Sequence, residues 1–308
     1  MRFCKSSHSF LAKSLTGLFA AMLLVAGLSP VVQAQESGDK QKTADKDVLR
    51  VCADPYMLPY SNREQQGYEN KIAELFARKM GVKLQYTFFP QRMGFIRNTL
   101  RKQKTDGTYE CDLVITVPEG FELAATTKPY YTSTYILAYR KDKTPGNIST
   151  PAEFAADAKK EDGFKMGLAD RGPAQLWVFR NGLMGNIVPY QGQPGDPKHN
   201  PGEVMMKDLA AGKIDAAIVW GPTAGYYAKR LKDKADIGML NLHNDPKHPD
   251  MRFEYSIAMA VRYGEKAWKA KIEKLIQDNK DEIQTILKDY GIPLLPLKVS
   301  AGGGDDDD

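Results

Sequence analysis

The segment LRVCADPYMLPYSN, residues 49–62, carries the clearest fold signal in the chain. Residues 49–52 have the apolar character of a short strand. Pro55 and Pro59 then stop any strand or helix, because proline lacks an amide donor and its φ angle is fixed. The sequence therefore predicts that a strand ends here in an open loop.

An amphipathic helix follows this loop. Apolar side chains recur at i, i+3, i+4 and i+8, with charges between them, at Ile72, Leu75, Phe76 and Met80. Strand, loop and helix form the first half of a βαβ unit, in which ligands bind beyond the carboxyl ends of the strands. We therefore expect the functional cleft to begin in residues 54–68.

Short apolar strands and amphipathic helices alternate along the rest of the chain. Further strands are predicted at 82–89, 111–116, 132–140, 165–168, 214–220 and 255–262. Further helices are predicted to begin at 90–94 and 149–154, and to span 174–183, 203–211, 223–231, 266–279 and 280–290. This pattern predicts an α/β fold with two lobes: lobe 1 from 47–138 plus 257–300, and lobe 2 from 139–256. Two long strands, near 132–141 and 255–262, would form a double-strand hinge.

The N-terminal segment 1–34 is predicted to be a secretory signal peptide. Arg2, Lys5 and Lys13 precede an apolar run at 15–28, and Ala34 ends a typical cleavage site. The alternative is an uncleaved anchor, for which the run is short. We expect a periplasmic protein that does not span the membrane after cleavage, with a flexible leader at 35–46 and a flexible acidic tail at 301–308.

Charge and cysteine content narrow the function further. The formal net charge of +5 becomes about +6 without the signal peptide and the acidic tail, which is too dilute for a nucleic-acid-binding surface. Cys52 and Cys111 remain after cleavage, and export favours a disulfide between them. If their strands have aligned ends, however, the two Cα atoms would be too far apart. A disulfide and two buried thiols both remain open.

Signals for catalysis, cofactors and metals are weak. No glycine-rich phosphate loop follows a strand, and no serine lies in a nucleophile-elbow pattern. His243 and His248 lie in a proline-broken loop without the spacing of metal ligands. Glu119 is a candidate general acid, but it has no identifiable partner. We therefore predict no catalytic residue, no metal and no cofactor.

Several longer segments resemble the extracellular solute-binding proteins of the amino-acid-receptor type. They are residues 49–61, 67–70, 112–115, 128–131 and 212–217. Residues 90–100, 219–226 and 290–294 are similar to the quinoprotein-dehydrogenase-associated branch of that family, the MxaJ/XoxJ type of periplasmic accessory protein. The resemblance implies a type II periplasmic binding protein fold. It also implies a PQQ-dependent methanol dehydrogenase as the partner.

The chain departs from the amino-acid receptors at both of their charged anchors. The stretch after the third strand, residues 116–125, lacks the arginine that binds the ligand carboxylate, and Trp220 stands where an acidic residue would hold the ammonium group. A buried zwitterion without partners is costly. The sequence therefore argues against an amino-acid ligand.

By position, six residues are predicted to line the cleft. They are Tyr56, Tyr60, Arg92, Glu119, Arg171 and Trp220. Aromatic rings with one arginine from each lobe would suit a small flat or acidic molecule, or a peptide segment of a partner protein. In the alternative, Tyr60 and Trp220 pack across the lobes and the arginines cap loops.

The resulting functional hypothesis is a non-enzymatic accessory protein that helps a methanol dehydrogenase to mature or become active. The first rival is a solute receptor of an ABC transporter for a small ligand other than an amino acid. The second is a cleft enzyme that uses Glu119.

Overall fold

The computed structural model describes residues 47–143, 148–170, 172–192 and 195–297. The predicted signal peptide (1–34), leader (35–46) and acidic tail (301–308), together with Arg171, lie outside these residues. Within the described ranges, no helix combines the length and apolarity that crossing a membrane requires.

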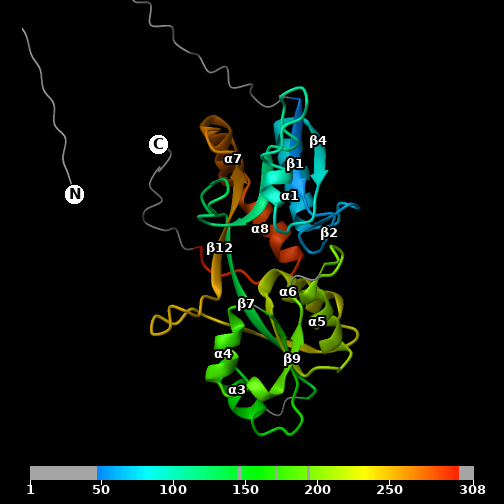
Figure 1. Ribbon diagram of the computed structural model, residues 1–308, viewed down its shortest axis with the longest axis vertical. Coiled ribbons are helices and arrows are strands. Elements are labelled where there is room, and N and C mark those ends of the chain that lie inside the picture. Colours follow the sequence, from blue (N-terminus) through cyan, green and yellow to red (C-terminus); the bar gives the residue numbers. More distant parts are fainter. Residues whose placement is uncertain (1–46, 144–147, 171, 193–194, 298–308) are drawn as a thin grey trace, which may run out of the picture. The chain divides into compact units, whose positions relative to one another are not determined.

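Strands and helices alternate along the described chain (Figure 1). The strands are β1 (Val48–Ala53), β2 (Tyr56–Met57), β3 (Ser61–Asn62), β4 (Lys83–Phe88), β5 (Leu113–Pro118), β6 (Ala125–Thr126), β7 (Tyr131–Arg140), β8 (Met166–Ala169), β9 (Ile187–Tyr190), β10 (Ala216–Trp220), β11 (Ile237–Asn241) and β12 (Glu254–Val261). The helices are α1 (Tyr68–Met80), α2 (Phe95–Asn98), α3 (Pro151–Ala158), α4 (Ala174–Arg180), the 3₁₀ turn η1 (Met184–Asn186), α5 (Pro201–Ala210), α6 (Gly221–Arg230), α7 (Lys266–Asp278) and α8 (Lys280–Asp289).

The main strands form one mixed sheet in the order β4-β1-β5-β12-β7-β10-β8-β9. Strand β1 pairs in parallel with β4 and β5, whereas β12 runs antiparallel to β5. Residues 254–257 of β12 pair with residues 131–134 of β7, and this pairing joins the first half of the sheet (β4, β1, β5) to the second (β10, β8, β9). The predicted α/β class and the two long connecting strands are confirmed. The predicted lobe boundaries remain a prediction.

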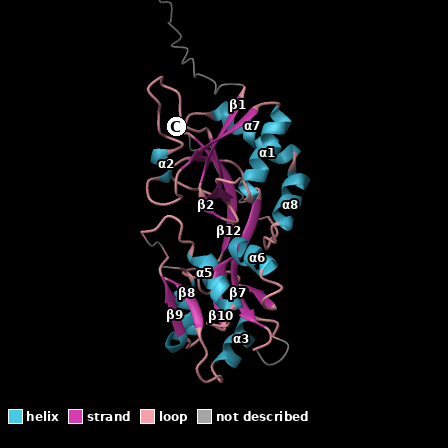
Figure 2. Cartoon of the chain, turned by 90° about the vertical axis from the view of Figure 1, so that its right-hand side faces the viewer, coloured by secondary structure: helices cyan, strands magenta, loops and turns pink. Residues whose placement is uncertain are grey.

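Each half of the sheet has apolar clusters on both of its faces. In the first half, α1, α7 and α8 cover one face, and the opposite face is covered by α2 and by loops. Figure 2 shows α2 on one side of the strands and α1 and α8 on the other. The helix α1 ends where Gly81 adopts a left-handed conformation with φ of 69°, as its position predicts.

Some elements differ from the sequence-based expectation. The helix predicted to begin at 90–94 is a single turn, α2, and α4 ends at Arg180 rather than at residue 183. The strands β9 and β11 were not predicted. Each pairs with one neighbouring strand, and β9 contains Pro189 and β11 contains Gly238, residue types that are depleted in strands.

Candidate functional site

The loop that follows β1 is held closed by its own polar groups. Asp54 is buried, and its carboxylate accepts backbone N–H groups of Tyr56 (2.7 Å) and Gln91 (2.5 Å). The Ser61 hydroxyl accepts the Asp54 N–H and donates to the Asp54 carbonyl oxygen, both at 2.9 Å. Burial raises the pKa of Asp54, although these N–H groups and Arg92 act to lower it. These hydrogen bonds tie the start of the loop to Ser61 and to the backbone of Gln91.

A second buried acid, Glu69, lies in the first turn of α1 and is only 4% exposed. Burial raises its pKa to about 7. A hydrogen bond from Thr116 opposes this shift, and the charge of Asp54 adds to it. No role was predicted for Glu69 from the sequence. A signal was present, since Glu69 lies three and seven residues before Ile72 and Phe76, on the apolar face of the helix.

Tyr60 belongs to the first half of the sheet, and Trp220 ends β10 in the second half. The centroid of the Tyr60 ring lies 5.4 Å from that of Tyr68. Burial raises the pKa of Tyr60 far above its ordinary value. The rings of Tyr60 and Trp220 both pack against the apolar cluster beneath α1, α7 and α8 in the first half. Packing of these two rings was one of the two roles that the sequence allowed, the other being ligand binding.

Trp220 belongs to a larger aromatic group at the strands that join the two halves. Its ring centroid lies 5.3 Å from that of Tyr135 and 5.7 Å from that of Tyr255, with edge-to-face geometry. Such pairs add roughly 0.5–1.5 kcal/mol each beyond their area burial. At the position where the family resemblance implies an acidic anchor, this chain has Trp220, which packs against Tyr135 and Tyr255.

Tyr56 and Arg92 contact one segment of the second half. The Lys198 ammonium lies 5.6 Å from the centre of the Tyr56 ring, and the Arg92 guanidinium donates to the Asp196 carbonyl oxygen. Nearby, the Asn200 amide donates to the Leu58 carbonyl oxygen at 3.1 Å. The structure thus brings Tyr56 and Arg92 to a common surface segment, residues 196–200.

Glu119 lies just beyond the end of β5. Its backbone N–H donates to the Ser256 carbonyl oxygen of β12 at 2.9 Å, and the residue is half-buried. Glu119 therefore lies close to the strand pairing that joins the two halves.

A cavity of about 570 Å³ opens in the second half, at the carboxyl ends of β8 and β9. Tyr135 forms one wall, and Asp170 and Gln191 supply polar side chains. The Asp170 carboxylate also accepts the N–H of Gly192. Because Tyr135 contacts Trp220, the predicted residue Trp220 lies next to this cavity wall. An aromatic wall with one carboxylate and one amide can bind a small polar molecule.

Among the described residues, no three His, Cys, Asp or Glu side chains are grouped as metal ligands. The Nδ1 atom of His243 lies 2.8 Å from a carboxylate oxygen of Glu254, so this histidine has a protein partner.

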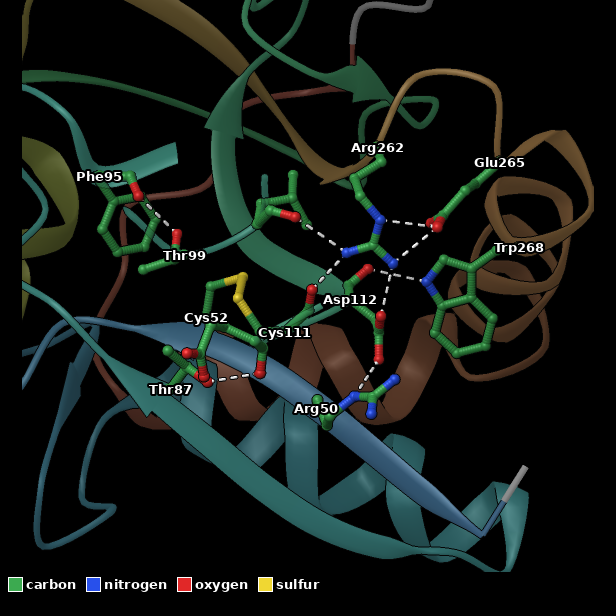
Figure 3. The surroundings of a disulfide bond; sticks show 12 residues. Arg50, Cys52, Thr87, Phe95, Thr99, Cys111, Asp112, Arg262, Glu265 and Trp268 are labelled. Carbon is green, nitrogen blue, oxygen red and sulfur yellow. Dashed lines mark hydrogen bonds and ion pairs between the residues drawn. A yellow bond between two sulfur atoms is a disulfide. The ribbon is translucent and has the colours of Figure 1, made fainter. Parts of the chain in front are cut away.

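Cys52 and Cys111 form a disulfide, with a Cα–Cα distance of 5.4 Å (Figure 3). This resolves the alternative left open by the sequence. In the parallel pairing of β1 with β5, Cys52 lies opposite Val114, which is three residues after Cys111. If β5 continued straight back to Cys111, the Cα atoms of Cys111 and Cys52 would be too far apart for a disulfide. The chain bends at Asp112, just before β5, and this bend brings Cys111 back to Cys52.

A buried charge network lies beside the disulfide (Figure 3). Asp112 pairs with Arg50 at 2.7 Å and with Arg262 at 2.6 Å, and its carbonyl oxygen accepts the Trp268 indole N–H at 2.9 Å. Arg262 also pairs with Glu265 at 2.7 Å. The network ties β5 to the start of α7 and so has a structural role.

Comparison with known proteins places these features in a family. Residues 49–292 match the family model for bacterial extracellular solute-binding proteins, family 3. Protein MoxJ of Methylorubrum extorquens is 27% identical over 299 residues, which cover 93% of this chain and 96% of MoxJ.

Solved structures agree with the family match. The periplasmic binding protein XoxJ from Methylobacterium extorquens AM1 is 31% identical, with a TM-score of 0.62 over 80% of this chain and 99% of XoxJ. MxaJ from Methlophaga aminisulfidivorans MPT is 24% identical, with a TM-score of 0.61 over 80% of this chain and all of MxaJ, and supports the fold alone. The predicted two-lobed periplasmic binding protein fold is confirmed, and the chain belongs to the bacterial extracellular solute-binding proteins, family 3, as a member of the MxaJ/XoxJ type.

Proposed function

We propose that this protein is a periplasmic, non-catalytic accessory protein of methanol oxidation. It binds a PQQ-dependent methanol dehydrogenase and assists its maturation or activation. The resemblance of residues 90–100, 219–226 and 290–294 to the MxaJ/XoxJ branch supports this partner, as does the similarity to MoxJ and XoxJ.

The observation that carries the proposal is the aromatic packing at Trp220. An amino-acid receptor needs an acidic residue there to hold the ammonium group, whereas Trp220 contacts Tyr135 and Tyr255. Residues 116–125 likewise contain no arginine for a ligand carboxylate. Because an uncompensated zwitterion is costly to bury, amino-acid transport is disfavoured and a protein partner is favoured.

The direct test uses the full chain and the dehydrogenase purified from the same organism. Co-elution in size-exclusion chromatography is expected, together with lower dehydrogenase activity in cells that lack this chain. No co-elution together with unchanged activity would overturn the proposal. Addition of each amino acid is expected to leave the melting temperature unchanged.

A second candidate is a receptor for a small solute other than an amino acid, delivered to an ABC transporter. The cavity beside Tyr135, Asp170 and Gln191 favours it. Thermal-shift screening separates the two functions, because a ligand at about 100 times its Kd adds roughly 2.7 kcal/mol of stability. A solute with this effect on the native protein, but not on Asp170→Asn, would support the receptor. Asp233→Asn is the matched control, since Asp233 is exposed and lies outside the cavity.

A further inference from the structure

One face of the first half has an unusually thin cover. The apolar cluster there includes Cys52, Val114 and Ala258 from the strands, and it is covered by Phe95 and Ile96 of α2 and by a loop at 119–124. The helix α2 is only four residues long. The opposite face is covered by α1, α7 and α8 (Figure 2).

The elements that cover this face expose apolar side chains. Met93, which precedes α2, is 95% exposed, and Leu123 in the neighbouring loop is 52% exposed. The Tyr263 hydroxyl donates to the Glu122 carbonyl oxygen at 2.9 Å, so this ring, 55% exposed, lies beside the same loop. Methionine and aromatic residues are enriched in protein–protein interfaces relative to the remaining surface.

Three exposed cations follow Met93 in the chain. Arg97, Arg101 and Lys104 are exposed, and none of them forms an ion pair with a residue in the described part of the chain. A Cβ atom at Gly94 would lie 3.5 Å from the Arg97 Nη2 atom, so the Arg97 guanidinium is beside the segment that carries Met93. We call Met93, Arg97, Arg101 and Lys104 the basic face.

The loop that carries Arg101 and Lys104 is hydrogen-bonded at both of its ends to Arg262. Arg262 Nη1 donates to the carbonyl oxygens of Leu100 (3.0 Å) and Cys111 (2.5 Å), which are the two ends of the loop that carries Arg101 and Lys104 (Figure 3). The disulfide fixes Cys111 to β1.

Inside the loop, the Lys104 N–H donates to the Thr108 carbonyl oxygen at 2.7 Å, and the Glu110 N–H donates to that of Lys102 at 3.0 Å. The backbone is thus ordered before any partner arrives, which lowers the entropy lost on binding.

We infer that the basic face docks on a carboxylate-rich surface of the dehydrogenase, and this inference rests on the proposed function. Guanidinium groups pair bidentately with carboxylates. The segment 93–104 carries an exposed methionine and three exposed cations that form no ion pair with described residues, which fits an acidic protein surface that also offers apolar groups. An anionic membrane is the weaker fit, since lipid-binding basic clusters hold about four to eight Lys or Arg residues and each adds about 1 kcal/mol.

The test compares the native chain with the triple variant Arg97→Gln, Arg101→Gln, Lys104→Gln, measuring association with the purified dehydrogenase at several salt concentrations. The triple variant is expected to associate about tenfold more slowly at low salt. The difference should shrink as salt rises, because a Debye length of about 3 Å at 1 M screens these charges. The matched control is Lys232→Gln, Lys234→Gln, Lys247→Gln. It removes the same charge from exposed residues of the second half that form no ion pair with described residues, and it is expected to bind like the native chain.

The outcomes separate this inference from the proposed function. If the native chain binds the dehydrogenase and the triple variant associates at the same rate, the inference that the basic face is the docking site is refuted, while the proposed accessory function stands. If the native chain does not bind, both fail. Loss of binding to phosphatidylglycerol vesicles by the triple variant, with dehydrogenase binding unchanged, would assign the face to the membrane and also overturn the inference. Circular dichroism should show the same fold and melting temperature for all three proteins.

Discussion

Replacing Glu69 with glutamine is expected to stabilise the protein at neutral and alkaline pH. Glu69 is 4% exposed, and burial raises its pKa from 4.5 to about 7. The folded state therefore holds this proton more tightly than the unfolded state does. The contribution of protonated Glu69 to the free energy of unfolding is therefore complete below pH 4.5, and it is lost as the pH rises through about 7. A glutamine stays neutral throughout, so the variant avoids this loss.

The size of the effect follows from the pKa difference. One pKa unit corresponds to about 1.4 kcal/mol, so the shift of Glu69 corresponds to about 3 kcal/mol between pH 4.5 and pH 8. For a domain of this size, each kcal/mol moves the melting temperature by about 2–4 °C. Glu69→Gln should therefore melt roughly 6–12 °C above the native protein at pH 8, and close to it at pH 4.5.

The assay is urea denaturation and thermal melting of both proteins between pH 4.5 and pH 8. The informative quantity is the difference between them at each pH, because Asp54 also has a raised pKa and contributes a pH dependence of the same sign to both. The matched control is Glu74→Gln on the same helix. The Glu74 side chain is 38% exposed and pairs with Lys71 at 2.9 Å, so its replacement should change stability by less than about 1 kcal/mol.

Two results would refute the reasoning. Equal pH dependence in the native protein and in Glu69→Gln would mean that Glu69 does not titrate in this range. A variant less stable than the native protein at pH 8 would mean that the charged carboxylate is stabilised in the folded state, through Thr116 and Ser61, by more than burial disfavours it.

Two other substitutions test the packing. Replacing Cys52 and Cys111 with alanine should lower the free energy of unfolding by about 4 kcal/mol, since the disulfide spans 59 residues, and dithiothreitol should give the native protein the same urea midpoint. An unchanged midpoint would exclude this role. Gly225→Ala should lower the melting temperature markedly, because its Cβ atom would lie 1.9 Å from the Gly291 carbonyl oxygen. Gly185→Ala, with no atom within 4 Å of the added carbon, should be near neutral, and similar losses in both variants would contradict the close approach.

Local patterns predicted most of the secondary structure. The 3.6-residue period of Ile72, Leu75 and Phe76 identifies α1, and Gly81 marks its end. The long apolar segments of β7 and β12 are visible because each is a continuous run of strand-forming residues. The helix α2 is a single turn, too short for a helical period to show, and the missed strands β9 and β11 contain Pro189 and Gly238, residue types that are depleted in strands.

Several site residues could be placed near one another by strand order, yet their contacts could not be predicted. Tyr60 and Trp220 were assigned to facing positions, and the structure shows them packed on a common apolar cluster. Whether they also bind a ligand or a partner stays a prediction. Arg262 was not singled out at all, because a buried arginine depends on carbonyl groups and acids far away in the sequence.

Residue order along the chain thus determined the strand–helix alternation, the absence of both amino-acid anchors and the resemblance to the MxaJ/XoxJ branch. Tertiary structure alone decided that a bend at Asp112 brings Cys111 to Cys52, and that Glu69 is buried, which raises its pKa, with the charge of Asp54 adding to the rise. The physical reason is distance. Periodicity reports which face a side chain occupies on its own element, whereas pairing and burial depend on elements that only folding brings together.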